Sequence, residues 1–202
     1  MRAGTEIGKR YAGDLRNRGA HQMKYILIRH GKTQGNLERR YIGCRTDEYL
    51  CVEGIAELKA QHYPDADMVF ASPMRRCIQT AGIIYPGKSI CIVDDFRECD
   101  FGDFEGYNYD ELKDDPAYQA WLASGGELPF PGGESRKEFS ERCVKAFESA
   151  VAALSGGSYA FVVHGGTIMA VMEHFTNGKY YDFQVQNGKG FILNADGSYE
   201  VL

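Results

Sequence analysis

Two histidines of this chain stand in the same short setting, in which an apolar run ends, the histidine follows and glycine comes next. The first setting is Arg29-His30-Gly31 and the second is His164-Gly165-Gly166. Glycine lets backbone N–H groups approach an anion closely. Two such turns at the same edge of a sheet would place both imidazoles across one crevice. The pattern therefore indicates a site for chemistry on a bound anion.

A third segment points to the same kind of site. Ser72-Pro73-Met74-Arg75 follows an apolar run, with Ser72 suited to the N-cap of a helix and Pro73 to its first position. Free N–H groups at a helix N-terminus favour anions, and the planar fork of Arg75 suits phosphate oxygens. Each residue alone is ordinary, since single histidines and arginines are usually structural or solvated. Three such segments together favour a phosphate site.

Metal chemistry is not indicated by the sequence. The chain has no H-E-x-x-H motif, and none of its six cysteines form a C-x-x-C pair. The acidic stretch 94–100 is interrupted by Arg97 and lacks the alternating carboxylates of a calcium loop. We therefore expect no metal and no cofactor, and we interpret the cysteines as cytosolic thiols.

Strands that alternate with helices are expected to position these residues. Apolar, β-rich runs predict buried strands over 24–29, 67–71, 89–93 and 158–163. Helices are expected over 52–61, from Ser72, over 109–122, over 135–154 and over 167–175. The third is interrupted near Pro116, and the fourth follows a capping box. A hairpin is expected over 190–202. This order predicts an α/β fold, a three-layer α/β/α sandwich around a mostly parallel sheet. Ligands of such sheets bind beyond the carboxyl ends of the strands, where His30 and His164 lie.

Length and composition narrow the classes of protein. A chain of 202 residues that is 44% hydrophobic fits one domain, which we place at 23–202. Residues 1–22 show no apolar periodicity and are expected to be a flexible extension. The net charge of −5 disfavours nucleic acid as a partner, and no apolar run is long enough for a membrane span. We expect a cytoplasmic protein that binds a small molecule; its oligomeric state is not determined by the sequence.

The ordered motifs resemble those of the histidine phosphatase superfamily, in its phosphoglycerate-mutase-like branch. The first block, 27–36, matches R-H-G-x-T-x-x-N. Agreement continues in four later blocks, at 72–81, 96–106, 131–135 and 163–166. The stretch from Cys99 to Gly106 is most similar to α-ribazole-5′-phosphate phosphatases and broad-specificity phosphatases of this branch. The resemblance covers about residues 23–193 and implies the phosphoglycerate-mutase-like fold.

The resemblance also implies roles for individual residues. His30 would be the phosphorylated nucleophile, Arg29 and Arg75 would hold phosphate, and Glu98 would donate a proton. His164 would donate to the phosphoryl oxygens. Thr33 and Asn36 would help to line the pocket, with Gly165 among the substrate-binding residues. The implied activity is metal-independent hydrolysis of a phosphomonoester through a phosphohistidine.

Two other functions stay open at this stage: a mutase-type phosphotransferase, and a non-catalytic protein that binds phosphate. Only 66 residues separate Glu98 from His164, which is shorter than in the cofactor-dependent mutases and favours water as the acceptor. The substrate is a small phosphorylated metabolite, with α-ribazole 5′-phosphate as one candidate. Loop aromatics could stack on a ring of the substrate, although each alone is better explained by loop packing; they are Tyr41, Tyr49, Phe104, Tyr107, Tyr109, Trp121 and Phe130.

Overall fold

A computed structural model describes residues 23–202, and the predicted flexible extension over 1–22 lies outside the described residues. Six strands form one sheet in the order β3-β2-β4-β1-β5-β6. They are β1 (Met23–Arg29), β2 (Met68–Ala71), β3 (Ile90–Ile92), β4 (Gly157–Val163), β5 (Gly190–Asn194) and β6 (Tyr199–Val201). The first four run parallel, whereas β5 and β6 are antiparallel to their neighbours. The predicted mostly parallel sheet is confirmed.

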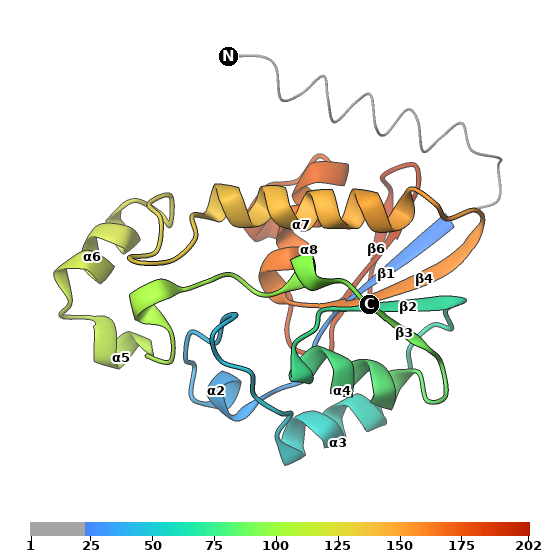
Figure 1. Cartoon of the computed structure of the whole chain (residues 1–202), viewed down its shortest axis with the longest axis horizontal. Coiled ribbons are helices and arrows are strands. Elements are labelled where there is room, and N and C mark those ends of the chain that lie inside the picture. The colour runs from blue at the N-terminus through green and yellow to red at the C-terminus, as the bar shows by residue number, and fades with distance from the viewer. Residues whose placement is uncertain (1–22) are drawn as a thin grey trace.

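Helices cover both faces of the sheet, which gives the expected three layers (Figure 1). The helices are α2 (Gln34–Leu37), α3 (Val52–Ala60), α4 (Arg75–Ile84), α5 (Tyr109–Leu112), α6 (Pro116–Ala123), α7 (Arg136–Val151) and α8 (Gly165–Phe175). α7 lies on one side of the sheet and α3 and α4 on the other, while α5 and α6 lie beyond its end (Figure 1). Three short 3₁₀ helices complete the fold, at Asp94–Phe96, Gly102–Phe104 and Tyr180–Phe183.

Local sequence signals explain most helix boundaries. Ser135 accepts from the N–H of Glu138, whose carboxylate accepts from the N–H of Ser135, so the predicted capping box opens α7. Asp115 caps α6 with Pro116 in its first turn, which separates α6 from α5. In the hairpin after β5, Gly197 adopts a φ of 86°, a conformation that glycine reaches without strain.

One predicted boundary is wrong. Ser72 was expected at the N-cap of the helix that follows β2, but α4 begins at Arg75 with Met74 at its N-cap. The hydroxyl of Ser72 instead meets the ring of His164, which competes with capping. A later start changes which side chains face inward, because successive residues of a helix point about 100° apart.

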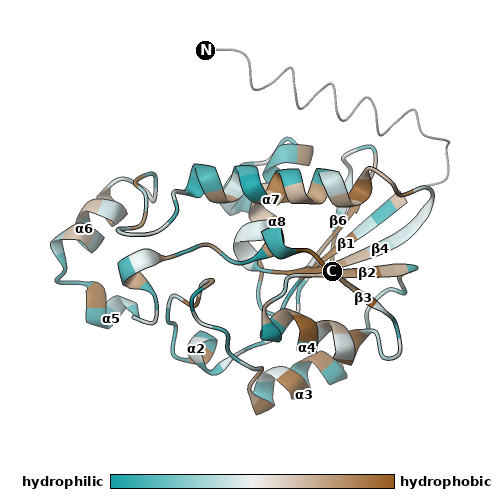
Figure 2. Ribbon diagram, in the orientation of Figure 1, coloured by the Kyte–Doolittle hydropathy of each residue, from teal (hydrophilic) through white to brown (hydrophobic). Residues whose placement is uncertain are grey.

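Aromatic side chains fill the core on the face of β4 that α7 covers. The ring of Phe161 is fully buried, stacks on Phe70 at 4.9 Å and contacts Phe147 at 4.8 Å. Apolar residues concentrate along the strands, where both faces are covered (Figure 2). The rigid strands of this core determine where His30 and His164 emerge.

The substitution Phe161→Ala tests this core. We expect it to lower the free energy of unfolding by about 3–5 kcal/mol, because it removes one fully buried ring, together with its contacts to neighbouring rings, and leaves a cavity. Urea denaturation measures the change. Tyr107→Ala is the control, since Tyr107 is half exposed; a similar loss in both variants would contradict the assignment of the core.

Candidate active site

The parallel pairing of β1 with β4 brings the two predicted histidines together. Arg29 lies opposite Val163 in the sheet, and the N–H of His30 donates to the carbonyl of Val163 at 2.9 Å. The next residue on β4 is His164, and the two imidazole centroids are 5.2 Å apart at an interplanar angle of 68°. The expectation that His30 and His164 share one crevice is therefore met.

His30 is held as a neutral imidazole. Its side chain is buried, and Nδ1 lies 2.7 Å from the carbonyl oxygen of Gly31. A carbonyl only accepts hydrogen bonds, so Nδ1 carries the proton and Nε2 keeps its lone pair. Burial, followed by the charges of Arg76 and Arg29, holds the pKa of His30 well below its usual 6.5. The Nε2 atom is thus unprotonated at neutral pH, as a nucleophile must be.

His164 is fixed in the opposite tautomer. Arg76 Nε donates to its Nδ1 at 3.4 Å, which leaves the proton on Nε2, and Nε2 lies 2.8 Å from Ser72 Oγ. All three side chains are fully buried. Burial and the charge of Arg76 also lower the pKa of His164 well below 6.5. Ser72 thereby helps to orient this imidazole, and its Oγ also accepts from the N–H of Met74 at 3.3 Å.

The structure corrects the assignment of one arginine. Arg75 points away from the histidines: about half of its side chain is exposed, its Nε lies 3.5 Å from Asp47, and its guanidinium stacks over Tyr49 at 4.8 Å. Its neighbour Arg76 is fully buried beside His164. The expected helix start at Ser72 selected the wrong arginine, because the true start at Arg75 turns Arg76 inward.

Backbone carbonyls hold the guanidinium of Arg76 in place. Its two terminal nitrogens donate to the carbonyl oxygens of Thr46 at 2.8 Å and Gly43 at 3.0 Å. The N–H of Gly43 in turn donates to Glu105 Oε1 at 2.9 Å. A Cβ on Gly43 would lie 2.3 Å from the carbonyl oxygen of Cys99, so only glycine fits here. The loop after α2 therefore delivers the carbonyls that position Arg76.

Arg29 supplies a second guanidinium from the end of β1. One terminal nitrogen donates to the carbonyl of Val185 at 2.7 Å, whereas the buried Nε has no partner among the described residues. An unsatisfied buried donor costs about 1–3 kcal/mol. Arg29 thus keeps donor capacity beside the histidines, as its predicted role requires.

Glu98 lies at the same edge of His164 as Arg76, with its Oε2 3.8 Å from Nδ1 of that ring. Its Oε1 accepts from the N–H of Cys99 at 3.0 Å. Burial raises the pKa of Glu98, although this hydrogen bond and the guanidiniums of Arg76 and Arg29 oppose the rise. The carboxyl is therefore closer to holding a proton at neutral pH than an exposed glutamate is.

Thr33 and Asn36 form the cap of α2. Thr33 Oγ1 accepts from the N–H of Asn36, and Asn36 Oδ1 accepts from the N–H of Thr33. Asn187 Nδ2 donates to Asn36 Oδ1 at 3.1 Å and to the carbonyl of His30 at 3.0 Å. Thr33 is fully buried and serves as the N-cap of α2, and its contact with substrate stays a prediction. Contact of Asn36 with substrate stays a prediction.

Two positioning residues were not assigned a role from the sequence. Asn187 links the turn after β1 to α2, yet it stands in a segment without a motif. Thr80 Oγ1 accepts from the N–H of Gly31 at 2.9 Å and donates to the carbonyl of Arg76 at 2.6 Å. Thr80 thus ties the nucleophile turn to α4. Its place within the 72–81 block was the only signal available.

Gly165 opens α8, and His164 is the N-cap without a side-chain hydrogen bond to the helix. The free N–H groups of this first turn therefore face the site, where they favour an anion. Gly166 is needed for space, because a Cβ there would lie 2.7 Å from Phe139 and 3.1 Å from Glu98 Oε1. The glycines thus bring α8 close to the reaction centre.

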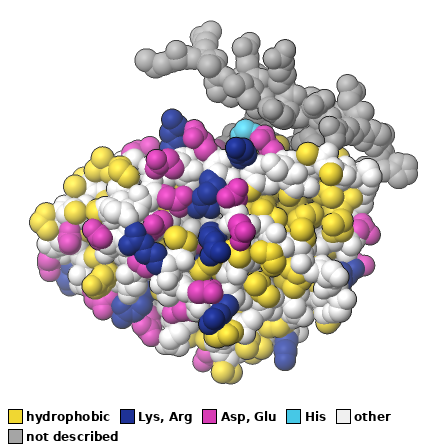
Figure 3. Space-filling view, viewed as in Figure 1, with side chains coloured by type: hydrophobic (Ala, Val, Ile, Leu, Met, Phe, Trp, Pro, Cys, Tyr) yellow, Lys and Arg dark blue, Asp and Glu magenta, His cyan; other side chains and the backbone are white. Residues whose placement is uncertain are grey.

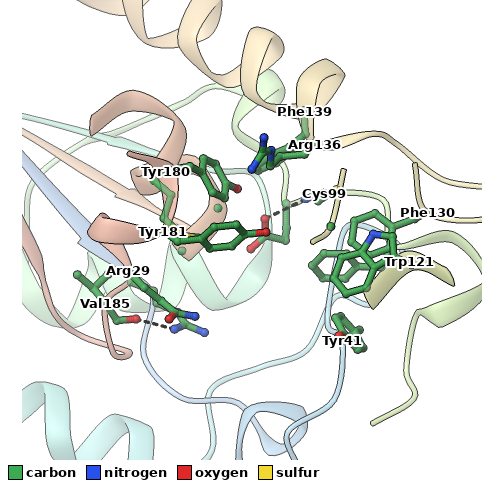
Figure 4. Close-up of a pocket in the computed structure, with 17 residues that line it drawn as sticks. Arg29, Tyr41, Cys99, Trp121, Phe130, Arg136, Phe139, Tyr180, Tyr181 and Val185 are labelled. Atoms are coloured by element: carbon green, nitrogen blue, oxygen red, sulfur yellow. Dashed lines mark hydrogen bonds between the residues drawn. The ribbon is translucent and has the colours of Figure 1, made fainter. Parts of the chain in front are cut away.

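A cavity of about 360 Å³ opens beside these residues. Arg29, Glu98 and Gly165 line it, and they connect it to His30 and His164, which lie outside its lining. Side chains from α6, α7 and the Tyr180–Phe183 turn surround the remainder (Figure 4). Of the loop aromatics, Tyr41, Trp121 and Phe130 line the cavity. The other four do not: Phe104 is buried in the core, and Tyr49, Tyr107 and Tyr109 are exposed.

The described part of the chain holds no group of three metal-ligating His, Cys, Asp or Glu side chains. None of its helices is long and apolar enough to cross a membrane. The face shown in Figure 3 carries acidic and basic side chains interspersed over α7 and around it.

Two imidazoles, two guanidiniums and a buried carboxyl lie together at the carboxyl edge of a parallel sheet, an arrangement suited to holding an anion. The family model of the histidine phosphatase superfamily (branch 1) matches residues 25–201. The chain belongs to this superfamily.

Relatives within the superfamily carry different activities in their names. A probable phosphatase from Schizosaccharomyces pombe is 32% identical over 87% of this chain and 84% of its own length. A 2,3-bisphosphoglycerate-dependent phosphoglycerate mutase from Methylobacterium radiotolerans is 28% identical over 85% of this chain and 90% of its own length. The crystal structure of a putative α-ribazole-5′-P phosphatase from Escherichia coli shares the fold, with a TM-score of 0.77 and 22% identity. The match covers 91% of this chain and 95% of the other chain.

The two adjacent arginines offer a matched test of the corrected assignment. Arg76→Ala should lower kcat/KM for a phosphomonoester by about 10²–10³-fold, because it removes a buried donor from the reacting group. Arg75→Ala should stay within about twofold of the unchanged protein. Steady-state kinetics with circular dichroism as a folding control measures both. A larger loss in Arg75→Ala would restore the original assignment.

Proposed function

We propose that this protein hydrolyses a phosphomonoester of a small metabolite through a phosphohistidine on His30. The observation that carries the proposal is the hydrogen bond from His30 Nδ1 to the Gly31 carbonyl, which leaves Nε2 unprotonated in a buried cationic site. A neutral buried imidazole beside two guanidiniums is suited to attack on an anionic phosphoryl group.

In the first step, Nε2 of His30 forms a bond to phosphorus while the ester P–O bond breaks. The departing oxygen takes a proton from the carboxyl of Glu98. In the second step, water attacks the phosphorus of the phosphohistidine, and the Glu98 carboxylate accepts the proton that the water releases. Inorganic phosphate leaves, and His30 regains its lone pair on Nε2.

Charge on the phosphoryl oxygens is stabilised by groups of the chain itself. Arg29 and Arg76 supply fixed cations, and the first turn of α8 supplies free N–H groups. His164 presents its Nδ1 edge to Arg76 and Glu98. Nδ1 accepts from Arg76 Nε and Nε2 faces Ser72 Oγ, so donation from His164 to the phosphoryl oxygens stays a prediction. We therefore propose that the reaction needs no metal.

A phosphotransferase of the mutase type is the second candidate, supported by the similarity to the phosphoglycerate mutase relative. It would share the phosphohistidine and differ only in the acceptor of the second step. Burst labelling followed by product analysis separates the two, because a hydrolase releases inorganic phosphate. The narrower proposal of α-ribazole 5′-phosphate as substrate rests on the motif resemblance.

Trapping of the phosphoenzyme tests the nucleophile. A ³²P-labelled monoester should label the protein in an acid-labile, base-stable form, and His30→Ala should abolish both the label and turnover. His62→Ala is the control, because His62 is exposed and far from the motif. Labelling should persist after treatment with EDTA. Label that survives in His30→Ala would assign the nucleophile to another residue.

Leaving groups of different basicity test Glu98. An alkoxide needs a proton to depart, whereas nitrophenolate does not, so Glu98→Gln should lose about 10²–10⁴-fold on an alkyl phosphate and far less on p-nitrophenyl phosphate. The pKa of Glu98 is raised, so the carboxyl is protonated below that pKa. Activity on the alkyl ester should therefore fall as the pH rises through the pKa of Glu98. This fall in activity should be absent in Glu98→Gln. Equal losses on both esters would make Glu98 a positioning residue.

A further inference from the structure

The cavity beside the reaction centre is walled mainly by rings. Trp121 and Phe130 pack at 5.0 Å, Tyr41 meets Trp121 at 6.2 Å, and Phe101 meets Tyr41 at 5.4 Å. Tyr180 and Tyr181 form the opposite wall, with Trp121 and Phe130 across the cavity from Tyr181 (Figure 4). Apolar walls with few polar groups are typical of small-molecule sites.

The polar atoms of these rings are mostly engaged or neutral. The hydroxyl of Tyr41 lies 3.0 Å from that of Tyr118, so one hydrogen bond occupies it. Burial raises the pKa values of Tyr41 and Tyr180 above the usual 10, so both phenols are uncharged at neutral pH. The wall therefore offers flat apolar faces rather than charged groups.

Arg136 is the cation at the outer part of the cavity, and its charge is already matched. It forms an ion pair with Glu127 and stacks over Tyr180 at 5.4 Å and Tyr181 at 5.9 Å. A carboxylate on the substrate would compete with Glu127 for this guanidinium. The other lining cation, Arg29, lies near His30, where the phosphoryl group is proposed to bind. Among the described lining residues, the outer cavity thus has no unpaired cation for the carboxylate of phosphoserine or phosphoglycerate.

The rim closes where Gly126 meets the rings. Gly126 has a φ of 78°, and a Cβ there would lie 3.0 Å from Tyr181 Oη and 3.4 Å from Trp121 Cζ2. The loop after α6 therefore approaches both walls closely. The cavity volume of about 360 Å³ is near the lower end of the range of about 300–1,000 Å³ for small-molecule sites. One or two fused rings fit this space better than a three-carbon chain, which would leave the walls uncovered.

We propose that this cavity binds the leaving group of the substrate, and that the leaving group carries an uncharged aromatic or heteroaromatic ring. This inference rests on the phosphatase activity proposed above. The ring packs between the Tyr181 wall and the Trp121–Phe130 wall while the phosphoryl group reaches His30 past Arg29 and Glu98. Trp121 and Tyr181 are then specificity-determining residues.

The chain provides a direct reporter, because Trp121 is its single tryptophan. The inactive variant His30→Ala can be titrated with 2-phenylethyl phosphate, phosphoserine and ethyl phosphate while Trp121 fluorescence is recorded. The aromatic ester should change the fluorescence saturably, and the two small esters should leave it within the change given by inorganic phosphate. An equal response to all three esters, or none to the aromatic ester, overturns the proposal.

Kinetics on the active protein give the second measurement. All three esters release alkoxides, so differences report mainly on the leaving-group site. The kcat/KM for 2-phenylethyl phosphate should exceed those for phosphoserine and ethyl phosphate by at least about tenfold, as burial of a ring in a matching pocket provides. Equal values, or a preference for phosphoserine, overturn the proposal.

Substitutions in the cavity wall test which residues cause the preference for the aromatic ester. Trp121→Ala should lower kcat/KM for the aromatic ester about tenfold and leave that for ethyl phosphate nearly unchanged. Tyr107→Ala is the control and should change neither value, because its half-exposed ring lies outside the cavity. Tyr181→Ala removes an exposed lining ring and serves if Trp121→Ala does not fold. Loss on both esters alike, in a folded variant, counts against the proposal. A fluorescence response without turnover of any ester would refute the phosphatase activity and leave the aromatic site standing.

Discussion

The in-register parallel pairing of β1 with β4 is the constraint on which the site depends. It places Arg29 opposite Val163, so that the residue after each strand is a histidine at the same height of the sheet. The strands are buried on both faces, with Phe161 and its ring neighbours filling one side. A slip of one residue would move every side chain of the strand to the opposite face. The 5.2 Å separation of the imidazoles is therefore a property of the core.

Around this pair the protein assembles positive charge without protonating the imidazoles. Arg76 and Arg29 lie close enough to depress the pKa values of His30 and His164, and burial acts in the same direction. The cost of burying two guanidiniums is offset by carbonyl acceptors, which come from Thr46, Gly43 and Val185. An arriving phosphate dianion would supply the counter-charge that the empty arrangement lacks. The site is thus organised for an anion before one binds.

The proposed chemistry and the proposed selectivity belong to different parts of the chain. The proposed reacting groups follow β1 and β4, stand in the first turn of α4, and lie in the loop after Asp94–Phe96, which supplies Glu98. The cavity is lined in part by α6, the loop around Gly126 and the Tyr180–Phe183 turn. Relatives of this chain bear phosphatase or mutase names.

The family resemblance implied the roles of Glu98 and Arg29. The sequence by itself determined the alternation of strands and helices along the chain and the placement of His30 and His164 directly after two buried strands. These follow from local signals, because apolar runs define buried strands and glycines mark the turns that follow them. It did not determine which of Arg75 and Arg76 turns inward, because that depends on where α4 begins, and Ser72, expected at the N-cap, lies against His164 instead. Nor did it reveal Asn187, or which loop aromatics share a cavity. Such contacts join segments far apart in the chain, and only the packed tertiary structure brings them within reach.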